Sequence, residues 1–132
     1  VELEVGSAYA ARVGYAFNGD GGAARSWYRL DSGAGSHTIR TSGYVADPGS
    51  GGLRIEVYRG NEGQETVNNL NSLPRVDFVN GSGTSSNELT VDLEAGKPHF
   101  ILITNLFSDY RRETMGGETT GYVEFDLEVT EN

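Results

Sequence analysis

Residues 123–129 read Val-Glu-Phe-Asp-Leu-Glu-Val, and this stretch decides the fold class. Its apolar residues occupy alternate positions, and acidic residues fill the positions between them. A β-strand sends successive side chains to opposite faces, so the pattern predicts a strand with one face in a core and the other in solvent. The same alternation recurs along the chain, and we therefore expect an all-β protein.

Turns rich in Gly, Asn and Ser divide the chain into about nine predicted strands. This spacing is typical of an antiparallel two-sheet β-sandwich or jelly roll. The run at 99–105 is apolar at successive positions, which predicts a central strand covered on both faces. The pair Ala95-Gly96 before it is expected to form a hairpin turn, and residues 59–73 a long connection. The strands are expected at residues 2–5, 9–17, 25–30, 37–41, 53–58, 75–79, 88–94, 99–105 and 123–129.

The predicted core contains the residues on the apolar phase of these alternating runs. They are Ile39, Ile55, Val57, Phe78, Leu89, Val91, Leu102, Phe125 and Leu127.

The 132 residues match the size of one domain, so we expect a single β-sandwich domain over residues 1–132. With 19 acidic and 10 basic residues the formal net charge is −9, which disfavours a nucleic-acid partner. The chain has no cysteine, and no apolar run is long enough to span a bilayer. Its start at Val1 without Met or a targeting segment is expected of a processed or excised fragment, in keeping with a secreted protein.

The order of several segments resembles the bacterial pre-peptidase C-terminal domain family. The segments are residues 27–30 (WYRL), 35–39 (GSHTI), 53–58 (LRIEVY), 89–96 (LTVDLEAG), 100–103 (FILI) and 121–129 (GYVEFDLEV), the last resembling a Gly-x-Tyr signature. The likeness covers roughly residues 23–129. The resemblance implies a β-sandwich accessory domain of secreted hydrolases, which helps secretion, folding or substrate contact and brings no catalytic residue.

Two departures from that family stand in one region. Where the family carries an Asp-rich strand, this chain has residues 53–58, and the acidic turn that follows in the family is replaced here by residues 59–63 (RGNEG). Residues 1–22 lie outside the likeness. A jelly-roll carbohydrate-binding module is therefore kept as the alternative.

Catalysis is not expected from the sequence. His37 enters a strand from a turn and His99 follows Lys97-Pro98, so both are predicted to lie at the surface or at a sheet edge. The chain has no Gly-x-Ser-x-Gly elbow. The carboxylates of Glu124, Asp126 and Glu128 share one strand face, where solvation is their expected role.

Residues 18–22 (NGDGG) form the one segment that suits a calcium ion, because hard cations take oxygen ligands and glycines let carbonyls converge. Asn18 and Asp20 would be the side-chain ligands. The acidic positions of an EF-hand loop are lacking, and an ordinary Asn- and Gly-rich turn is the competing interpretation.

A ligand surface is predicted where aromatic side chains meet polar ones, since sugars and peptides use both. Trp27 alternates with arginines on the face opposite Tyr28. The segment 106–120 lacks periodicity, and loops of this length are often functional. The predicted ligand-binding residues are Trp27, Tyr44, Phe107, Tyr110 and Arg111.

The sequence thus predicts a non-catalytic accessory or binding module of a secreted bacterial protein, whose partner is a polysaccharide or the protein substrate of a parent enzyme. A carbohydrate-binding module is the alternative within the binding class. A structural surface or appendage subunit and a small glycan-active enzyme are the competing classes. An apolar strand edge would favour the structural subunit, and an acid and a base in one cleft would favour the enzyme.

Overall fold

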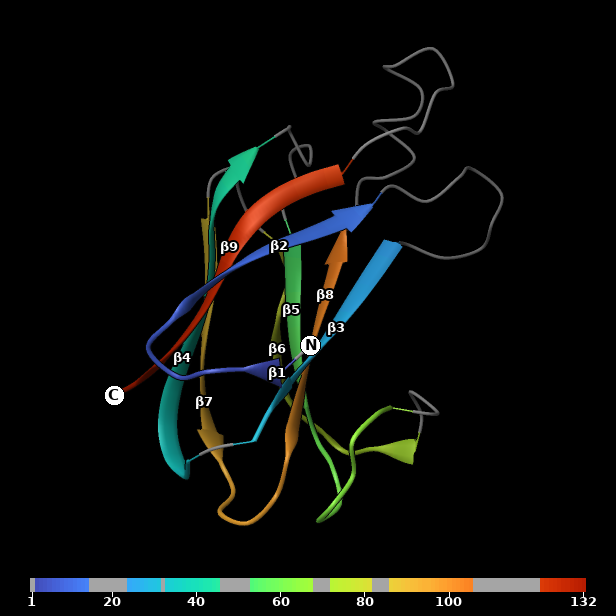
Figure 1. The fold of residues 1–132 in the computed structure, drawn as a ribbon, viewed down its shortest axis with the longest axis vertical. Helices are drawn as coiled ribbons and strands as arrows, with labels where there is room; N and C mark the ends of the chain where they lie inside the picture. Colours follow the sequence, from blue (N-terminus) through green and yellow to red (C-terminus); the bar gives the residue numbers. More distant parts are fainter. Residues whose placement is uncertain are drawn as a thin grey trace.

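The computed structural model describes residues 2–14, 24–31, 33–45, 53–67, 72–81, 86–105 and 122–132. These residues form two packed β-sheets (Figure 1). Sheet A has the strand order β1-β3-β8-β5-β6, and sheet B has the order β2-β9-β4-β7. The predicted all-β sandwich is confirmed. The strands are β1 (Glu2–Leu3), β2 (Ala8–Gly14), β3 (Ala24–Leu30), β4 (Gly35–Val45), β5 (Leu53–Arg59), β6 (Arg75–Val79), β7 (Ser86–Leu93), β8 (His99–Asn105) and β9 (Tyr122–Glu131).

Two features of the topology differ from the sequence prediction. Strand β1 pairs with β3 in parallel, so sheet A is mixed rather than purely antiparallel. The turn at Ala95-Gly96 does not close a hairpin, because β7 pairs with β4 in sheet B while β8 lies between β3 and β5 in sheet A. Strand β8 is apolar on both faces and takes a central place in sheet A, and the turn therefore crosses from one sheet to the other.

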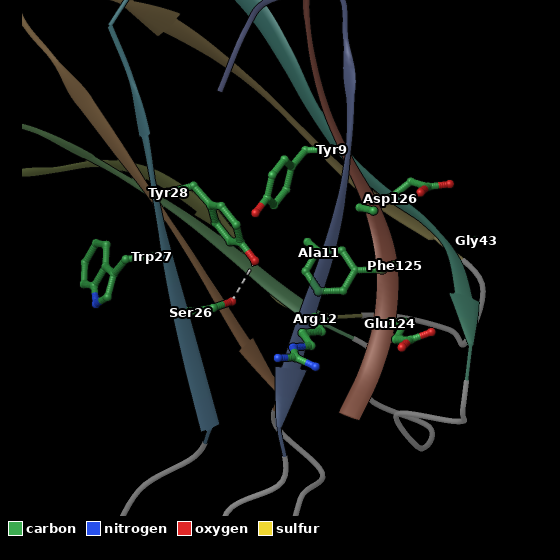
Figure 2. A pocket seen from close by; sticks show the side chains of 11 residues that line it. Tyr9, Ala11, Arg12, Ser26, Trp27, Tyr28, Gly43, Glu124, Phe125 and Asp126 are labelled. Atoms are coloured by element: carbon green, nitrogen blue, oxygen red, sulfur yellow. Dashed lines mark hydrogen bonds between the residues drawn. The ribbon is translucent and has the colours of Figure 1, made fainter. Parts of the chain in front are cut away.

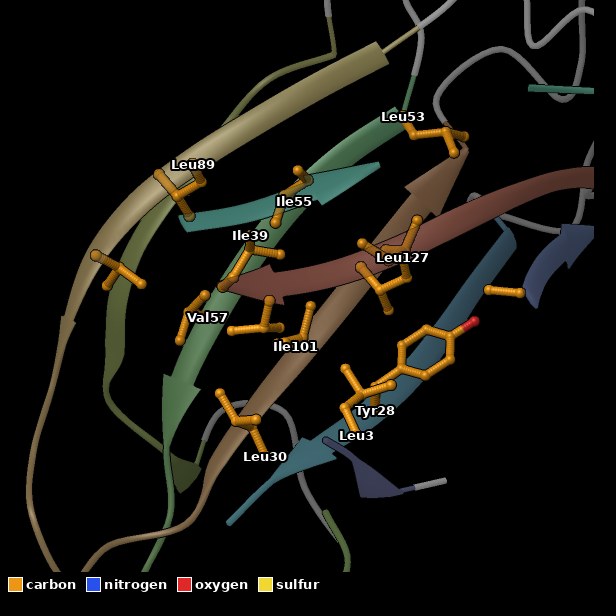
Figure 3. Packing of buried hydrophobic residues seen from close by; sticks show 14 of the residues in the cluster. Leu3, Tyr28, Leu30, Ile39, Leu53, Ile55, Val57, Leu89, Ile101 and Leu127 are labelled. Atoms are coloured by element: carbon orange, nitrogen blue, oxygen red, sulfur yellow. The ribbon is translucent and has the colours of Figure 1, made fainter. Parts of the chain in front are cut away.

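The main core lies between the two sheets (Figure 3), where side chains from both inner faces meet. Ile39, Leu89 and Leu127 enter it from sheet B, and Ile55 and Val57 enter from sheet A. Val91 and Phe125 belong to the same cluster. The alternation in the sequence therefore assigned the inner face of most strands correctly.

A second apolar cluster lies on the outer face of sheet A, the face turned away from sheet B. Phe100 and Leu102 of β8 and Tyr58 of β5 are buried there together with Leu73. Val67 and Trp27 pack against them. Leu102 is buried as predicted, but in this outer cluster. Residues of the connection between β5 and β6 cover part of the outer face, which explains why β8 is buried along its whole length.

Phe78 was predicted in the core, and the structure shows this prediction to be wrong. Its side chain is 37% exposed on the edge strand β6. It lies on the outer face of sheet A, with the guanidinium carbons of Arg54 and Arg75 at 4.9 and 4.0 Å from its ring centroid. The register of β6 against β5 shifts between Val57 and Tyr58. Alternation alone does not tell which face of a short edge strand turns inward, and a bulge makes the assignment harder.

His37 and His99 were predicted at the surface or an edge, but both are buried, with exposed fractions of 0% and 1%. The Nδ1 atom of His37 is 2.9 Å from the Gly35 carbonyl oxygen. The Nε2 atom of His99 accepts the Glu94 N–H at 3.2 Å. Burial lowers the pKa of His99 because it disfavours the cation. Each ring fills space beside a turn and has one nitrogen bonded to the main chain, while the buried Nε2 atom of His37 has no hydrogen-bond partner among the described residues.

Main-chain amides at two edge positions are bonded to side chains. The Asp77 carboxylate accepts the Phe78 N–H on β6 at 2.8 Å, and the Asn87 side-chain oxygen accepts the Glu88 N–H on β7 at 3.0 Å. A paired amide is a poorer template for a further strand.

Candidate functional site

A pocket of about 590 Å³ lies where the edge strand β2 of sheet B approaches β3 of sheet A (Figure 2). Its volume falls within the range of about 300–1,000 Å³ usual for small-molecule sites. Aromatic rings, hydroxyls and charged groups from β2, β3 and β9 share the lining. The lining residues are Tyr9, Ala10, Ala11, Arg12, Ser26, Trp27, Tyr28, Gly43, Glu124, Phe125 and Asp126.

Two tyrosines form the inner wall of this pocket. The rings of Tyr9 and Tyr28 turn toward each other in Figure 2 and meet edge to face, with centroids 5.8 Å apart. The Ser26 hydroxyl donates to the Tyr28 hydroxyl at 3.2 Å. Burial raises the pKa of Tyr28, so the phenol stays neutral at physiological pH. The wall is therefore aromatic, and the hydrogen bond from Ser26 holds the Tyr28 hydroxyl in place.

The rim of the pocket on sheet B is charged. Arg12 lies opposite Glu124 in the register of β2 and β9, and Ala10 lies opposite Asp126. The small side chain of Ala10 leaves room between these charged neighbours. Gly43 has a φ of +63°, and a Cβ atom there would lie 3.2 Å from the Asp126 carboxylate, so glycine lets that carboxylate lie close to the main chain.

Trp27 is the predicted ligand residue that contributes to this pocket. It is half-buried, and its indole lies on the opposite side of β3 from Tyr28 (Figure 2). Its ring centroid is 5.5 Å from that of Tyr58 in the outer cluster. Trp27 also lines a second, smaller cleft of about 210 Å³ with Arg29, Val67 and Phe100. Trp27 therefore connects the pocket with the outer face of sheet A.

Tyr44 was predicted in a loop, but it lies within β4, which extends beyond the predicted strand. Its hydroxyl is 2.6 Å from the Thr41 hydroxyl oxygen, and its ring packs edge-on against Phe125 at 6.5 Å. Burial raises the pKa of Tyr44. The ring packs against the main core, so Tyr44 supports Phe125 from behind and does not line the pocket.

The remaining predicted site residues lie outside the described part of the chain. These are Phe107, Tyr110 and Arg111 of the predicted ligand loop, and Asn18 and Asp20 of the predicted calcium loop. Across the ranges that are described, no group of three or more His, Asp or Glu side chains is arranged to hold a metal ion.

The sequence analysis did not identify Tyr9, Ser26 or Tyr28 as site residues. Tyr9 and Tyr28 fell on the apolar phase of their strands, and this assignment is correct for their direction. What places them at an opening is the strand order, since β2 ends one sheet and β3 lies near the end of the other. A tyrosine on the apolar phase is the signal available in the sequence, because its hydroxyl needs a partner or water.

Comparisons with known proteins leave the family open. No family model matches the chain, and no curated protein resembles it at a significant level. Within the described ranges, no helix has the length and apolar character needed to cross a membrane.

Proposed function

We propose that the chain is a non-catalytic binding module of a larger secreted bacterial protein, and that the pocket between β2 and β3 holds one unit of a glycan. The observation that carries this proposal is the pocket lining. Sugars present apolar ring faces and hydroxyl groups together, and the pocket offers aromatic rings beside Ser26, Arg12 and two carboxylates. An accessory role, in which the module holds a parent enzyme on its substrate, follows from this binding.

The placement of the pocket on strands supports binding with little ordering cost. Tyr9 and Tyr28 pack on each other, and the Tyr28 hydroxyl is held by a hydrogen bond from Ser26. Rigid contact groups lose less conformational entropy when a ligand binds. This favours a recognition surface that is formed before the ligand arrives.

The geometry of the carboxylates supports a non-catalytic role. Glu124 and Asp126 are two residues apart on β9, so they project side by side from the outer face of sheet B. Hydrolysis of a glycosidic bond needs two carboxyl groups that flank the bond. The Ser26 hydroxyl is bonded to a neutral tyrosine, and within the described ranges no base is bonded to it that would activate it as a nucleophile.

A pocket-filling substitution tests the proposal. Ala10→Trp places a bulky ring in the pocket from an exposed position, and Ala8→Trp is the matched control on the same strand face outside the lining. A glycan array probed with the whole chain identifies the ligand. We expect Ala10→Trp to weaken binding at least tenfold and Ala8→Trp to leave it unchanged, with both variants melting like the wild type.

Two outcomes contradict the proposal. Wild-type affinity in a folded Ala10→Trp variant would place the binding site elsewhere. Release of shorter saccharides during incubation with the bound glycan would show that the module is an enzyme.

A further inference from the structure

The outer face of sheet A carries an unusual share of the positive charge of this acidic chain. Four of its ten basic residues, Arg25, Arg29, Arg54 and Arg75, project from this face, while the chain as a whole has a formal net charge of −9. Arg29 is held by three carboxylates, those of Glu2, Asp31 and Glu65. The other three arginines have fewer carboxylate partners among the described residues.

Arg54 and Arg75 share one carboxylate. Both contact Glu56, at 3.5 and 3.2 Å, and Glu56 also accepts a hydrogen bond from the Tyr58 hydroxyl at 2.7 Å. The Arg54 atom in this ion pair is Nε, which is buried and makes no hydrogen bond within the described part of the chain. Arg25 is exposed and forms no ion pair with a described residue. Among the described residues, Arg54 and Arg75 therefore share one carboxylate and Arg25 is paired with none.

Arg54 and Arg75 are held against one aromatic ring. The guanidinium groups of both lie over the Phe78 ring. A guanidinium that stacks on a ring keeps its N–H groups in the plane of the fork, where they can bind a carboxylate with two parallel hydrogen bonds. This arrangement presents donors to an anion at the surface.

The register of the strands sets the spacing of the basic groups. Arg25 of β3 and Arg54 of β5 both lie opposite Thr104 of β8, one on each side. Two strand spacings separate them, about 10 Å at the main chain. In the next row Trp27 lies opposite Leu102, which puts an aromatic ring beside Arg25 and toward the pocket. A ligand that extends from the pocket across Trp27 therefore reaches the row that holds Arg25 and Arg54.

We infer that the ligand is an acidic polysaccharide, whose carboxylates bind Arg25 and Arg54 while a neighbouring unit occupies the pocket. This inference rests on the proposed glycan-binding function. A separation of about 10 Å suits charges that recur along a polymer better than one small anion. The face of a paired sheet presents side chains and directs its main-chain groups within the sheet plane, so it offers an extended peptide no strand to pair with.

Matched probes test the charge requirement. Oligogalacturonate and its fully methyl-esterified form share one backbone and differ in charge. We expect the acid form to bind at least tenfold more tightly and its affinity to fall as salt rises. Arg25→Gln and Arg54→Gln should each weaken binding of the acid form about five- to tenfold by removing a charge-assisted hydrogen bond. Arg40→Gln on the outer face of sheet B is the matched control and should have no effect.

The outcomes separate this inference from the proposed function. Equal binding of the two probes, or wild-type affinity in both arginine variants, overturns the inference while glycan binding stands. Binding only to neutral glycans of an array does the same. Binding to none of the glycans refutes the proposed function as well. Equal affinity for poly-glutamate would replace the polysaccharide with an acidic peptide.

Discussion

Sheet B keeps its outer face in solvent, whereas sheet A covers the outer face of its central strands with a second apolar cluster. In sheet B, the outward residues of β7 and β9 are mostly acidic or hydroxylated, as at Glu88, Asp92 and Glu124. In sheet A, β8 is buried at every position. The difference teaches that alternation identifies a strand with one solvent face, while a continuous apolar run identifies a strand between two layers. The proposed ligand face lies on the sheet whose outer side is partly closed.

The largest expected effect on stability comes from replacing a phenylalanine by alanine on the inner face of a sheet, compared with the same replacement on an outer face. Phe125→Ala should lower the free energy of unfolding by about 3–5 kcal/mol, since a buried aromatic leaves a cavity. Phe78→Ala should lower it by only about 1 kcal/mol, through lost stacking with two arginines. Urea unfolding measures both variants. Equal losses would mean that one of the two strand faces is assigned wrongly.

A second variant asks whether the outer cluster of sheet A behaves as a core. Leu102→Ala should lower the free energy of unfolding by about 2–4 kcal/mol, because Leu102 is 1% exposed beneath Trp27 and the connection that follows β5. Asp92→Ala on the open face of sheet B should change it by about 0.5 kcal/mol or less. If Leu102→Ala lowers the free energy of unfolding no more than Asp92→Ala does, the outer cluster is not a packed core.

Carboxylates on the two outer faces should differ in the same way. Glu56 is buried and bonded to Tyr58, Arg54 and Arg75, so Glu56→Gln should lower the free energy of unfolding by about 1–3 kcal/mol. Glu88 forms an exposed ion pair with Arg40 at 2.9 Å, and Glu88→Gln should lower it by about 0.5 kcal/mol or less. Thermal or urea unfolding of the pair decides whether burial sets the difference.

The smallest effect concerns stability in acid at the turn between β7 and β8, where the chain crosses from sheet B to sheet A. Burial lowers the pKa of His99 from its ordinary value of 6.5; Arg59 and His37 lower it further, while Glu94 and the Lys97 carbonyl oppose the shift. The unfolded chain therefore takes up this proton first as the pH falls.

The contribution of His99 is complete above pH 6.5 and is lost as the pH falls toward the folded pKa. His99→Gln keeps an acceptor for the Glu94 N–H and does not titrate in this range. Melting temperatures across the weakly acid range should therefore fall less steeply in this variant than in the wild type. Parallel curves would assign the acid sensitivity to other groups.

Much of the fold could be predicted because it depends on local pattern. The alternation at residues 123–129 and 88–94 places Phe125, Leu127 and Leu89 in the core, and the apolar run at residues 99–105 indicates the doubly covered strand. Strand partners were not predictable in this way. The order of strands in each sheet, the parallel pairing of β1 and the phase of the bulged edge strand β6 depend on tertiary contacts.

The candidate site was less accessible from the sequence, because it is made at an opening between sheets. Trp27 was identified from its solvent-facing phase. Tyr9 and Tyr28 carried the same signal as core residues, and their place at the pocket follows from which strands end each sheet. Arg54 is distant in the sequence from Arg75 and Phe78, and pairing of β5 with β6 brings it beside them.

In the longer protein proposed above, the bonded amides of Phe78 and Glu88 would bear on the neighbouring domains. β-Domains joined in series can exchange strands during synthesis, when one domain is folded and the next is still extended. At these two positions a folded copy offers an incoming strand no free N–H, because a side chain already accepts it. These bonded amides therefore disfavour strand exchange between adjacent β-domains of such a chain.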